Sequence, residues 1–294
     1  MDRRTFISAA GIAAVGAASA CSQGSDGTSE RVAAPAVNRG RTRRLRMVTT
    51  WPPGFPGLGT AAVRTAELIT QMSGGSLEVE VYGAGEIVGA FEVFDAVSNG
   101  VADMYHAADY YWQGRSPAFN FYCAVPLGMT PYEIMAWVEY GGGQELWNEL
   151  SNPFNIQPFQ AGNTGHQMGG WFKREINTLE DFRGLRMRIP GLGGNVIREL
   201  GGAAVALSGG EIYQSLQSGA IDATEWVGPW NDLAFGFYRE APYYYGPGGD
   251  RARRMSCREQ SEPGRIQSPE RTRPSHADRG PWGAAALLLG RYLA

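Results

Sequence analysis

Cysteine, histidine and lysine are scarce in this chain of 294 residues, and each shortage excludes a class of site. Only Cys123 of the three cysteines lies between residues 47 and 246, so no intramolecular disulfide can form there. His106 and His166 have no cysteine or further histidine near them in the sequence, which argues against a zinc site. Lys173 is the only lysine, and no nucleophile–base pair is apparent. These absences favour a protein that binds its ligand over one that converts it.

The sequence also lacks long apolar runs, and its central region does not carry an excess of basic residues. No stretch of 18 or more apolar residues follows the N-terminus, which argues against a membrane-spanning helix. Residues 47–249 carry 9 basic against 21 acidic residues, so they lack the positive footprint that nucleic-acid binding requires. Hydrophobic residues make up 43% of the chain, enough for a core, and the length predicts two lobes.

The N-terminus is typical of an export signal. Asp2 to Ile7 form a twin-arginine pattern, followed by an apolar run rich in alanine and glycine, so residues 1–21 are predicted to be a twin-arginine signal peptide. Ala18-Ser19-Ala20 suits a signal peptidase. Alternatively, the same residues and Cys21 form a lipoprotein box that lacks its usual large aliphatic residue, which would anchor the protein through Cys21. Residues 22–45 are predicted to be a disordered tether.

The body of the chain predicts an α/β fold with two lobes that face each other across a cleft, with 46–158 mainly in the first lobe and 159–246 mainly in the second. Strands and helices alternate from residue 46 onward, which indicates a parallel sheet. In such sheets the ligand lies beyond the carboxyl ends of the strands, in a cleft between the lobes. The expected strands are 46–51, 77–82, 101–107, 155–159, 167–172 and 185–189, and the expected helices are 60–72, 91–99, 131–150 (interrupted by glycines 141–143), 194–200 and 210–217.

The sequence changes character at about residue 247. Residues 247–294 show neither helical nor strand periodicity over most of their length, and arginine dominates their charge. We interpret this tail as aberrant: the C-terminal part is truncated or translated in a shifted reading frame of a GC-rich gene. A disordered extension and a basic tail for an anionic partner are the alternatives.

Four side chains suggest a site for a small acid with a cation. Arg188 closes a predicted strand, and a guanidinium fork matches a carboxylate. The amides of Asn163 and Gln167 and the carboxylate of Glu225 suit a hard cation such as sodium or calcium. Simpler interpretations remain open: Arg188 as a surface charge, Asn163 as a turn residue, Glu225 as a surface acid, and Trp226 and Trp230 as core residues.

Three blocks of sequence, Gly83–Ala118, Ala161–Gly194 and Leu216–Ala234, resemble the solute-binding subunits of tripartite ATP-independent periplasmic (TRAP) transporters. The similarity covers roughly residues 45–245 and is greatest to the branch that binds α-keto acids such as pyruvate, or lactate with a metal. It implies the α/β, two-lobed periplasmic-binding-protein fold with the ligand cleft between the lobes. Members of the family normally continue past Tyr243 with several helices that brace both lobes. The Arg-rich tail stands in their place here.

The resemblance implies a role for each candidate residue. Arg188 pairs with the substrate carboxylate, Asn163 hydrogen-bonds the substrate, and Tyr111 closes over it. Trp226 is a further substrate-binding residue. Gln167 and Glu225 hold sodium or calcium with the backbone carbonyl of Trp226, and the substrate completes the shell. The implied partners are a small organic acid and the membrane subunits of a TRAP transporter, the implied location is the periplasm, and a homodimer is compatible with the family.

The function expected from this resemblance is capture of a 2-oxo or 2-hydroxy monocarboxylate by closure of two lobes, followed by delivery to the transporter. One alternative is a metal-assisted enzyme that acts on keto acids through Glu225. The other is a non-functional truncated relic.

Overall fold

The computed structural model describes residues 42–246, which lie within one compact unit. The predictions for the signal peptide, for Cys21, for all but the end of the tether and for the tail after residue 246 fall outside the described residues. Within residues 42–246 no helix combines the length and the apolar character needed to cross a membrane.

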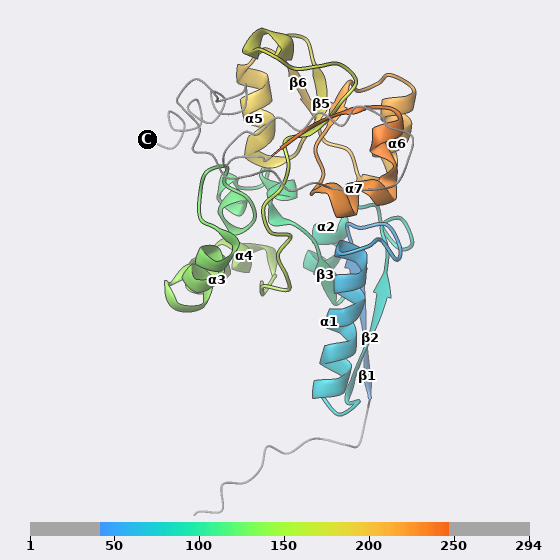
Figure 1. Ribbon diagram of the computed structural model, residues 1–294. Helices are drawn as coiled ribbons and strands as arrows, with labels where there is room; N and C mark the ends of the chain where they lie inside the picture. Colours follow the sequence, from blue (N-terminus) through green and yellow to red (C-terminus); the bar gives the residue numbers. More distant parts are fainter. Residues whose placement is uncertain (1–41, 247–294) are drawn as a thin grey trace, which may run out of the picture. The chain divides into compact units, whose positions relative to one another are not determined.

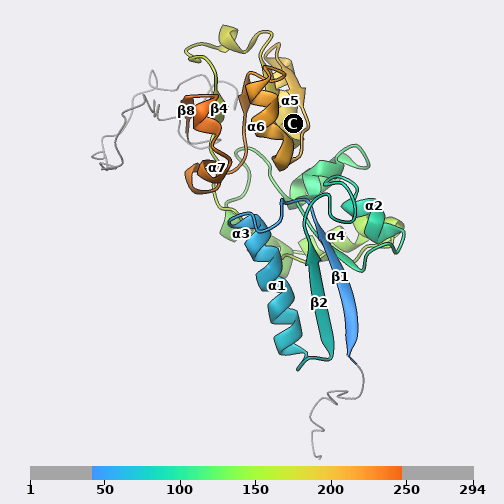
Figure 2. The ribbon, with the colours of Figure 1, turned by 90° about the vertical axis from the view of Figure 1, so that its right-hand side faces the viewer.

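The first lobe contains a parallel sheet of three strands with the order β2-β1-β3. A strand–helix–strand–helix–strand order produces it, as the sequence predicts. Figures 1 and 2 show α1 running along β1 and β2. The elements are β1 (Arg43–Thr49), α1 (Leu58–Met72), β2 (Leu77–Tyr82), α2 (Val93–Ser98) and β3 (Met104–His106). Because β1 begins at Arg43, the predicted tether extends too far, and its last three residues belong to the sheet.

Short helices follow the first sheet. The predicted interruption of the helix over 131–150 is confirmed, because Gly142 takes a φ of 83° between α3 and α4. Thr130 begins α3 with a capping box, in which its hydroxyl accepts from Glu133 N and the Glu133 carboxylate accepts from Thr130 N. The elements are η1 (Asp109–Trp112), η2 (Pro117–Tyr122), α3 (Pro131–Tyr140), α4 (Gly143–Ser151) and η3 (Asn152–Phe154).

The predicted strand over 155–159 is wrong. Residues 155–169 contain neither helix nor strand. Asn155 takes a left-handed φ of 59°, which ends η3 and turns the chain, and Pro158 has no N–H to give to a ladder. This irregular segment leads from the first lobe to the second sheet and carries Asn163.

The second sheet has five strands with the order β6-β5-β7-β4-β8. Strands β6, β5 and β7 are parallel, and β4 runs antiparallel to β7 and β8. The elements are β4 (Gly170–Phe172), η4 (Leu179–Phe182), β5 (Arg186–Arg188), α5 (Gly191–Glu199), β6 (Ala203–Val205), α6 (Gly209–Gln217), β7 (Ala223–Thr224), α7 (Pro229–Phe235), η5 (Phe237–Arg239) and β8 (Tyr243–Tyr245).

Helices cover both faces of this second sheet, with α5 and α6 on opposite sides of the strands (Figure 1). Alternation along the strands explains the arrangement. Phe172 packs into the cluster that holds Ile197 of α5, whereas its neighbour Trp171 packs into the cluster that holds Ile212 of α6. The fold is therefore the predicted mixed α/β class with two lobes, each built on its own sheet.

Candidate functional site

The site is built where the parallel strands of the second sheet end. Arg188 is the last residue of β5, and Glu225 follows directly after β7. Because β5 and β7 are parallel neighbours, their carboxyl ends meet at one edge of the sheet, and the backbone N–H of Glu225 donates to Arg188 O at 2.9 Å. Two residues that are 37 positions apart in the sequence are thereby brought into contact.

Arg188 is almost entirely buried, with 1% of its surface exposed. Its Nη1 donates to the backbone oxygen of Glu225 at 2.7 Å, its Nε donates to Leu207 O at 3.1 Å, and its Cζ lies 4.9 Å from the ring centroid of Trp226. Its Nη2 has no hydrogen-bond partner among the described residues. The interpretation of Arg188 as a surface charge is therefore wrong, and a buried guanidinium with a free N–H group calls for an anionic partner.

Glu225 complements Arg188. The carboxylate is buried, its Oε2 lies 3.5 Å from Arg188 Nη1, and its Oε1 has no partner within residues 42–246. Burial raises the pKa of Glu225 to about 8; the charge of Arg188 opposes this rise, and that of Asp232 adds to it. The surface interpretation of Glu225 is wrong too. A free carboxylate oxygen in such surroundings is suited to a cation.

Trp226 is a core residue whose backbone lies at the site. Its ring packs edge-on against Trp51 at 6.2 Å and Phe55 at 5.9 Å, measured between centroids. The core interpretation of its side chain is therefore confirmed, whereas Trp230 is 67% exposed and does not belong to the core. The role of the Trp226 carbonyl as a cation ligand stays a prediction.

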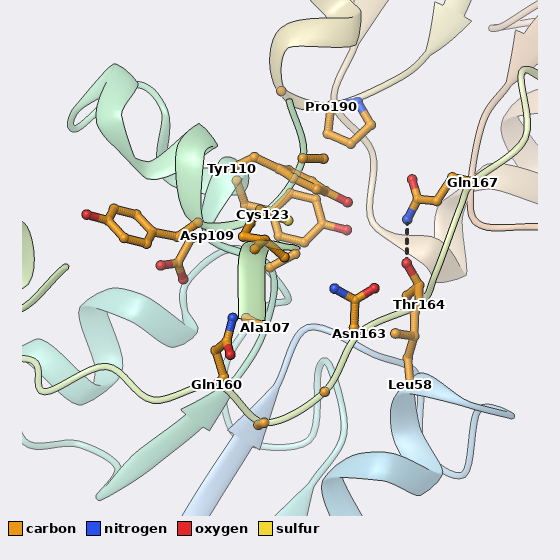
Figure 3. A pocket seen from close by; sticks show the side chains of 18 of the residues that line it. Leu58, Ala107, Asp109, Tyr110, Cys123, Gln160, Asn163, Thr164, Gln167 and Pro190 are labelled. Carbon is orange, nitrogen blue, oxygen red and sulfur yellow. Dashed lines mark hydrogen bonds between the residues drawn. The ribbon is translucent and has the colours of Figure 1, made fainter. Parts of the chain in front are cut away.

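Asn163 and Gln167 lie on the irregular segment before β4 and line a cavity (Figure 3). Asn163 Oδ1 accepts from Gly165 N at 2.7 Å, so Asn163 forms a turn as well as lining the cavity. Gln167 Nε2 donates to Thr164 Oγ1 at 3.1 Å. The next residue, Met168, donates its N–H to Val227 O at 2.9 Å. Gln167 directly precedes Met168, and Trp226 directly precedes Val227. The bond therefore joins the two segments that carry the predicted cation ligands.

The cavity has a volume of about 1400 Å³ and is lined by residues of both lobes. This exceeds the roughly 300–1,000 Å³ of a typical small-molecule pocket, so a small acid would not fill it. Glu225 and Trp226 line it, whereas the buried Arg188 does not. Within the described part of the chain, no three side chains of His, Cys, Asp or Glu are grouped to hold a metal ion. The predicted ligand set consists of one carboxylate, one amide and one backbone carbonyl. It contains only one residue of these four types, so this absence does not bear on it.

Tyr111 lies on the first lobe and lines the cavity near the charged pair. The charges of Arg188 and Glu225 both act on the pKa of Tyr111, which burial raises. Its neighbour Tyr110 is a site residue that sequence reasoning missed. Tyr110 is buried and faces the cavity (Figure 3), and its Cβ approaches Gly191 at the start of α5 so closely that a Cβ on that glycine would lie 3.2 Å away. The neighbouring tyrosines in the sequence were the available signal.

Asp232 is the second missed residue. It lies in the first turn of α7 with 1% of its surface exposed. Its Oδ1 accepts from Val227 N and Gly228 N, both at 3.1 Å, and its Oδ2 accepts from Trp171 Nε1 at 2.9 Å. The Pro229-x-x-Asp232 spacing, with proline at the first helical position and an acid in the first turn, is typical of a helix start and could have indicated this role.

Comparison with known proteins places these features in a family. Residues 47–250 match the family model for bacterial extracellular solute-binding proteins, family 7. The monocarboxylate 2-oxoacid-binding periplasmic protein of Nostoc sp. is 42% identical over 252 residues, which are 84% of this chain and 66% of that protein.

Two solved structures of TRAP periplasmic solute-binding proteins are similar to this chain. The one from Pseudoalteromonas atlantica, with bound sodium and pyruvate, is 45% identical, with a TM-score of 0.68 over 70% of this chain and 62% of that one. The one from Colwellia psychrerythraea, with bound calcium and pyruvate, is 43% identical, with a TM-score of 0.67 over 69% and 62%. The chain thus spans less than two thirds of the length of each of these three relatives.

Proposed function

This chain belongs to the bacterial extracellular solute-binding proteins of family 7, and on that premise we propose that it captures a 2-oxo or 2-hydroxy monocarboxylate together with sodium or calcium. The acid is pyruvate-like or lactate. We further propose that the protein acts outside the cytoplasm and delivers the acid to the membrane subunits of a TRAP transporter. The bound ligands of the P. atlantica and C. psychrerythraea proteins support the proposal.

One observation carries the proposal: two buried groups of opposite charge each keep a free polar atom. Arg188 Nη2 and Glu225 Oε1 have no hydrogen-bond partner in the described part of the chain, although neither is exposed to solvent. Such atoms are costly to bury alone. A ligand carboxylate satisfies the first and a cation satisfies the second, so an acid bound with a cation removes both costs at once.

The proposed roles follow from this arrangement. Arg188 pairs with the carboxylate of the acid, and Asn163 offers its amide from the segment across the cavity. Gln167, Glu225 and the carbonyl of Trp226 would hold the cation, which supplies a positive charge for the oxygens of the acid. Carboxylate, amide and carbonyl oxygens are the ligands that such hard cations prefer.

Closure of the lobes is the proposed mechanism. The cavity is larger than one small acid, and Glu225 lines it, while Arg188 is buried with its Cζ 4.9 Å from the ring centroid of Trp226. Movement of the first lobe toward the second would place the ring of Tyr111 over the acid and exclude water. Closure is then stabilised by contacts that exist only in the closed state.

The test is calorimetric titration of pyruvate, with sodium or calcium present, into the whole chain and into Arg188→Ala. Removing one partner of a buried charge pair costs about 2–5 kcal/mol, so Arg188→Ala should lose most of the affinity. Arg186→Ala is the matched control, because Arg186 lies on the same face of β5 and makes an exposed pair with Asp222. Equal affinity in wild type and Arg188→Ala would refute the assignment.

The enzyme alternative makes a different prediction for the same samples. A binding protein returns its ligand unchanged, whereas a metal-assisted keto-acid enzyme consumes it. NMR of pyruvate after prolonged incubation with the protein and calcium should show the starting acid alone. A new product that disappears in Glu225→Gln would favour the enzyme.

A further inference from the structure

His106 brings a single unpaired donor to the cavity from the first lobe. It is the last residue of β3, at the carboxyl end of the first sheet, and it lines the cavity. Ligands of open α/β sheets lie beyond this edge of the strands. Its Nδ1 accepts from Trp51 Nε1 at 2.8 Å, whereas its Nε2 is buried and has no hydrogen-bond partner within residues 42–246.

The bond from Trp51 determines which nitrogen of His106 carries the hydrogen. An indole N–H group can only donate, so Nδ1 is the nitrogen without hydrogen and Nε2 is the one with it. Burial lowers the pKa of His106, which keeps the ring in this neutral form. Nε2 is therefore a fixed donor. A buried N–H group without an acceptor is unfavourable, and an acceptor atom of a ligand would satisfy it.

The indole of Trp51 joins this donor to the proposed acid site. Its ring lies 6.2 Å from that of His106 and 6.2 Å from that of Trp226, measured between centroids, and all three residues line the same cavity. The groups proposed to hold the carboxylate and the cation, Arg188 and Glu225, belong to the second lobe. An acid held there by its carboxylate directs its tail toward the first lobe, and the cavity has room for a tail longer than that of pyruvate.

We propose that His106 is a specificity-determining residue whose Nε2–H group donates to an acceptor oxygen on the tail of the acid. The inference rests on the proposed function and narrows its substrate class. The preferred ligands are 2-oxo or 2-hydroxy monocarboxylates longer than pyruvate that carry an ether, hydroxyl or carbonyl oxygen on their fourth or fifth carbon. An acid of equal length with an alkyl tail leaves the N–H group unpaired and binds less tightly.

The test uses two pairs of acids, and the members of a pair differ in one chain atom. The first pair is 4-methoxy-2-oxobutanoate and 2-oxohexanoate, and the second is 5-methoxy-2-oxopentanoate and 2-oxoheptanoate. An ether oxygen accepts but cannot donate, so it reports on a protein donor. Calorimetry with calcium or sodium present gives the dissociation constant of each acid for the whole chain. The ratio of alkyl to ether acid is taken within each protein, so that a general loss of affinity cancels.

Three variants identify the donor. His106→Phe removes the N–H group and keeps a ring. Trp51→Phe with His106→Phe also removes the indole N–H group, which the single variant leaves without its acceptor. His166→Phe is the matched control, because His166 lines the same cavity but is exposed. Thermal melting followed by far-ultraviolet circular dichroism checks that each variant is folded.

Wild type and His166→Phe should bind the ether acid of at least one pair about threefold to tenfold more tightly than its alkyl partner, the effect of one hydrogen bond between neutral groups. Both His106 variants should bind the alkyl acid at least as tightly as the ether acid. Equal ratios in wild type and the His106 variants would overturn the inference. So would the same change in His166→Phe, or a wild-type ratio that returns in the double variant, which would trace the effect to a disturbed Trp51.

Wild type alone separates failure of this inference from failure of the proposed function. If it binds pyruvate but prefers the alkyl acid in both pairs, the inference is wrong and the proposed function stands. If it binds neither pyruvate nor any of the four longer acids with either cation, the proposed function itself fails.

Discussion

Arg188 and Glu225 are joined through both main chain and side chain. Glu225 N donates to Arg188 O at 2.9 Å, and Arg188 Nη1 returns a bond to Glu225 O at 2.7 Å while lying 3.5 Å from Oε2. These two bonds fix the positions of both residues. Arg188 Nη2 and Glu225 Oε1 have no hydrogen-bond partner within residues 42–246 and remain available to a ligand. The register of β5 against β7 therefore determines how the charged groups of Arg188 and Glu225 are placed relative to each other.

Glu225→Gln should uncouple the acid from the cation. Glutamine retains the shape of the side chain but removes the charge that the cation requires, so calcium or sodium should no longer tighten pyruvate binding. Coupling between two ligands is reciprocal and typically about 1–3 kcal/mol. Calorimetry of each ligand with and without the other measures it. Glu180→Gln, which removes a carboxylate that is 72% exposed, should keep the full coupling. Coupling that persists in Glu225→Gln would contradict the assignment.

Tyr111→Ala should weaken pyruvate binding by at least about 1 kcal/mol, as truncation of an aromatic anchor does. Tyr111→Phe should lose less, because the ring surface and its packing on Phe91 at 5.0 Å are kept. Tyr132→Ala, on a residue that is 84% exposed on α3, is the control. If Tyr111→Ala binds as wild type does, the ring does not cover the acid.

Asp109 should make the stability fall as the pH rises. Burial raises its pKa to about 7, against the bond from Trp147 Nε1 at 2.7 Å, which lowers it. Below pH of about 4 the carboxyl group is protonated in the folded and the unfolded chain. Between about 4 and 7 the unfolded chain loses the proton and the folded one keeps it, so rising pH favours unfolding by up to about 1.4 kcal/mol per unit.

Asp109→Asn removes that titration and can still accept from Trp147. Urea denaturation at a series of pH values should show a smaller loss of stability between pH 4 and 7 in the variant than in wild type. Parallel curves for the two proteins would show that Asp109 is ionised when folded.

Gly170→Ala should destabilise the second sheet. Gly170 takes a φ of 119° at the start of β4, and a Cβ there would lie 2.5 Å from Thr224 O. The backbone of β7 must move to admit it, so a loss of more than about 1 kcal/mol in the free energy of unfolding is expected. Gly114→Ala, where a Cβ meets open space, should change it by less than about 0.5 kcal/mol. Similar denaturation midpoints for the two variants would contradict the prediction.

Two strands of the first sheet were predictable because β1, with seven residues, and β2, with six, are long enough to show their pattern. Residues 77–82 alternate between exposed glutamates and less exposed side chains, and the strand predicted there has the observed bounds. The second sheet was harder to predict. Strand β7 is two residues long and β6 and β8 are three each, too short for periodicity to reveal, and tertiary pairing defines them.

The site shows the same division. Arg188 stands at the end of a readable strand, and the apolar neighbours of Glu225 indicated its burial. Tyr110 was missed, because the adjacent tyrosines are a weak signal and its place at the site depends on the close approach to Gly191. The bond from Met168 to Val227 depends on how an irregular segment meets a turn, which carries no local pattern.

The loop between β1 and α1 touches the segment after β7, although 175 positions separate Pro56 from Asn231. Trp51 and Phe55 pack against the ring of Trp226, and Asn231 Nδ2 donates to Pro56 O at 2.8 Å. During divergence of the family, residues 51–57 and 226–231 should therefore vary together. A substitution in this early loop can therefore change the preferred acid or cation, although the loop contacts neither ligand. Two relatives with the same ligating residues need not share the same specificity.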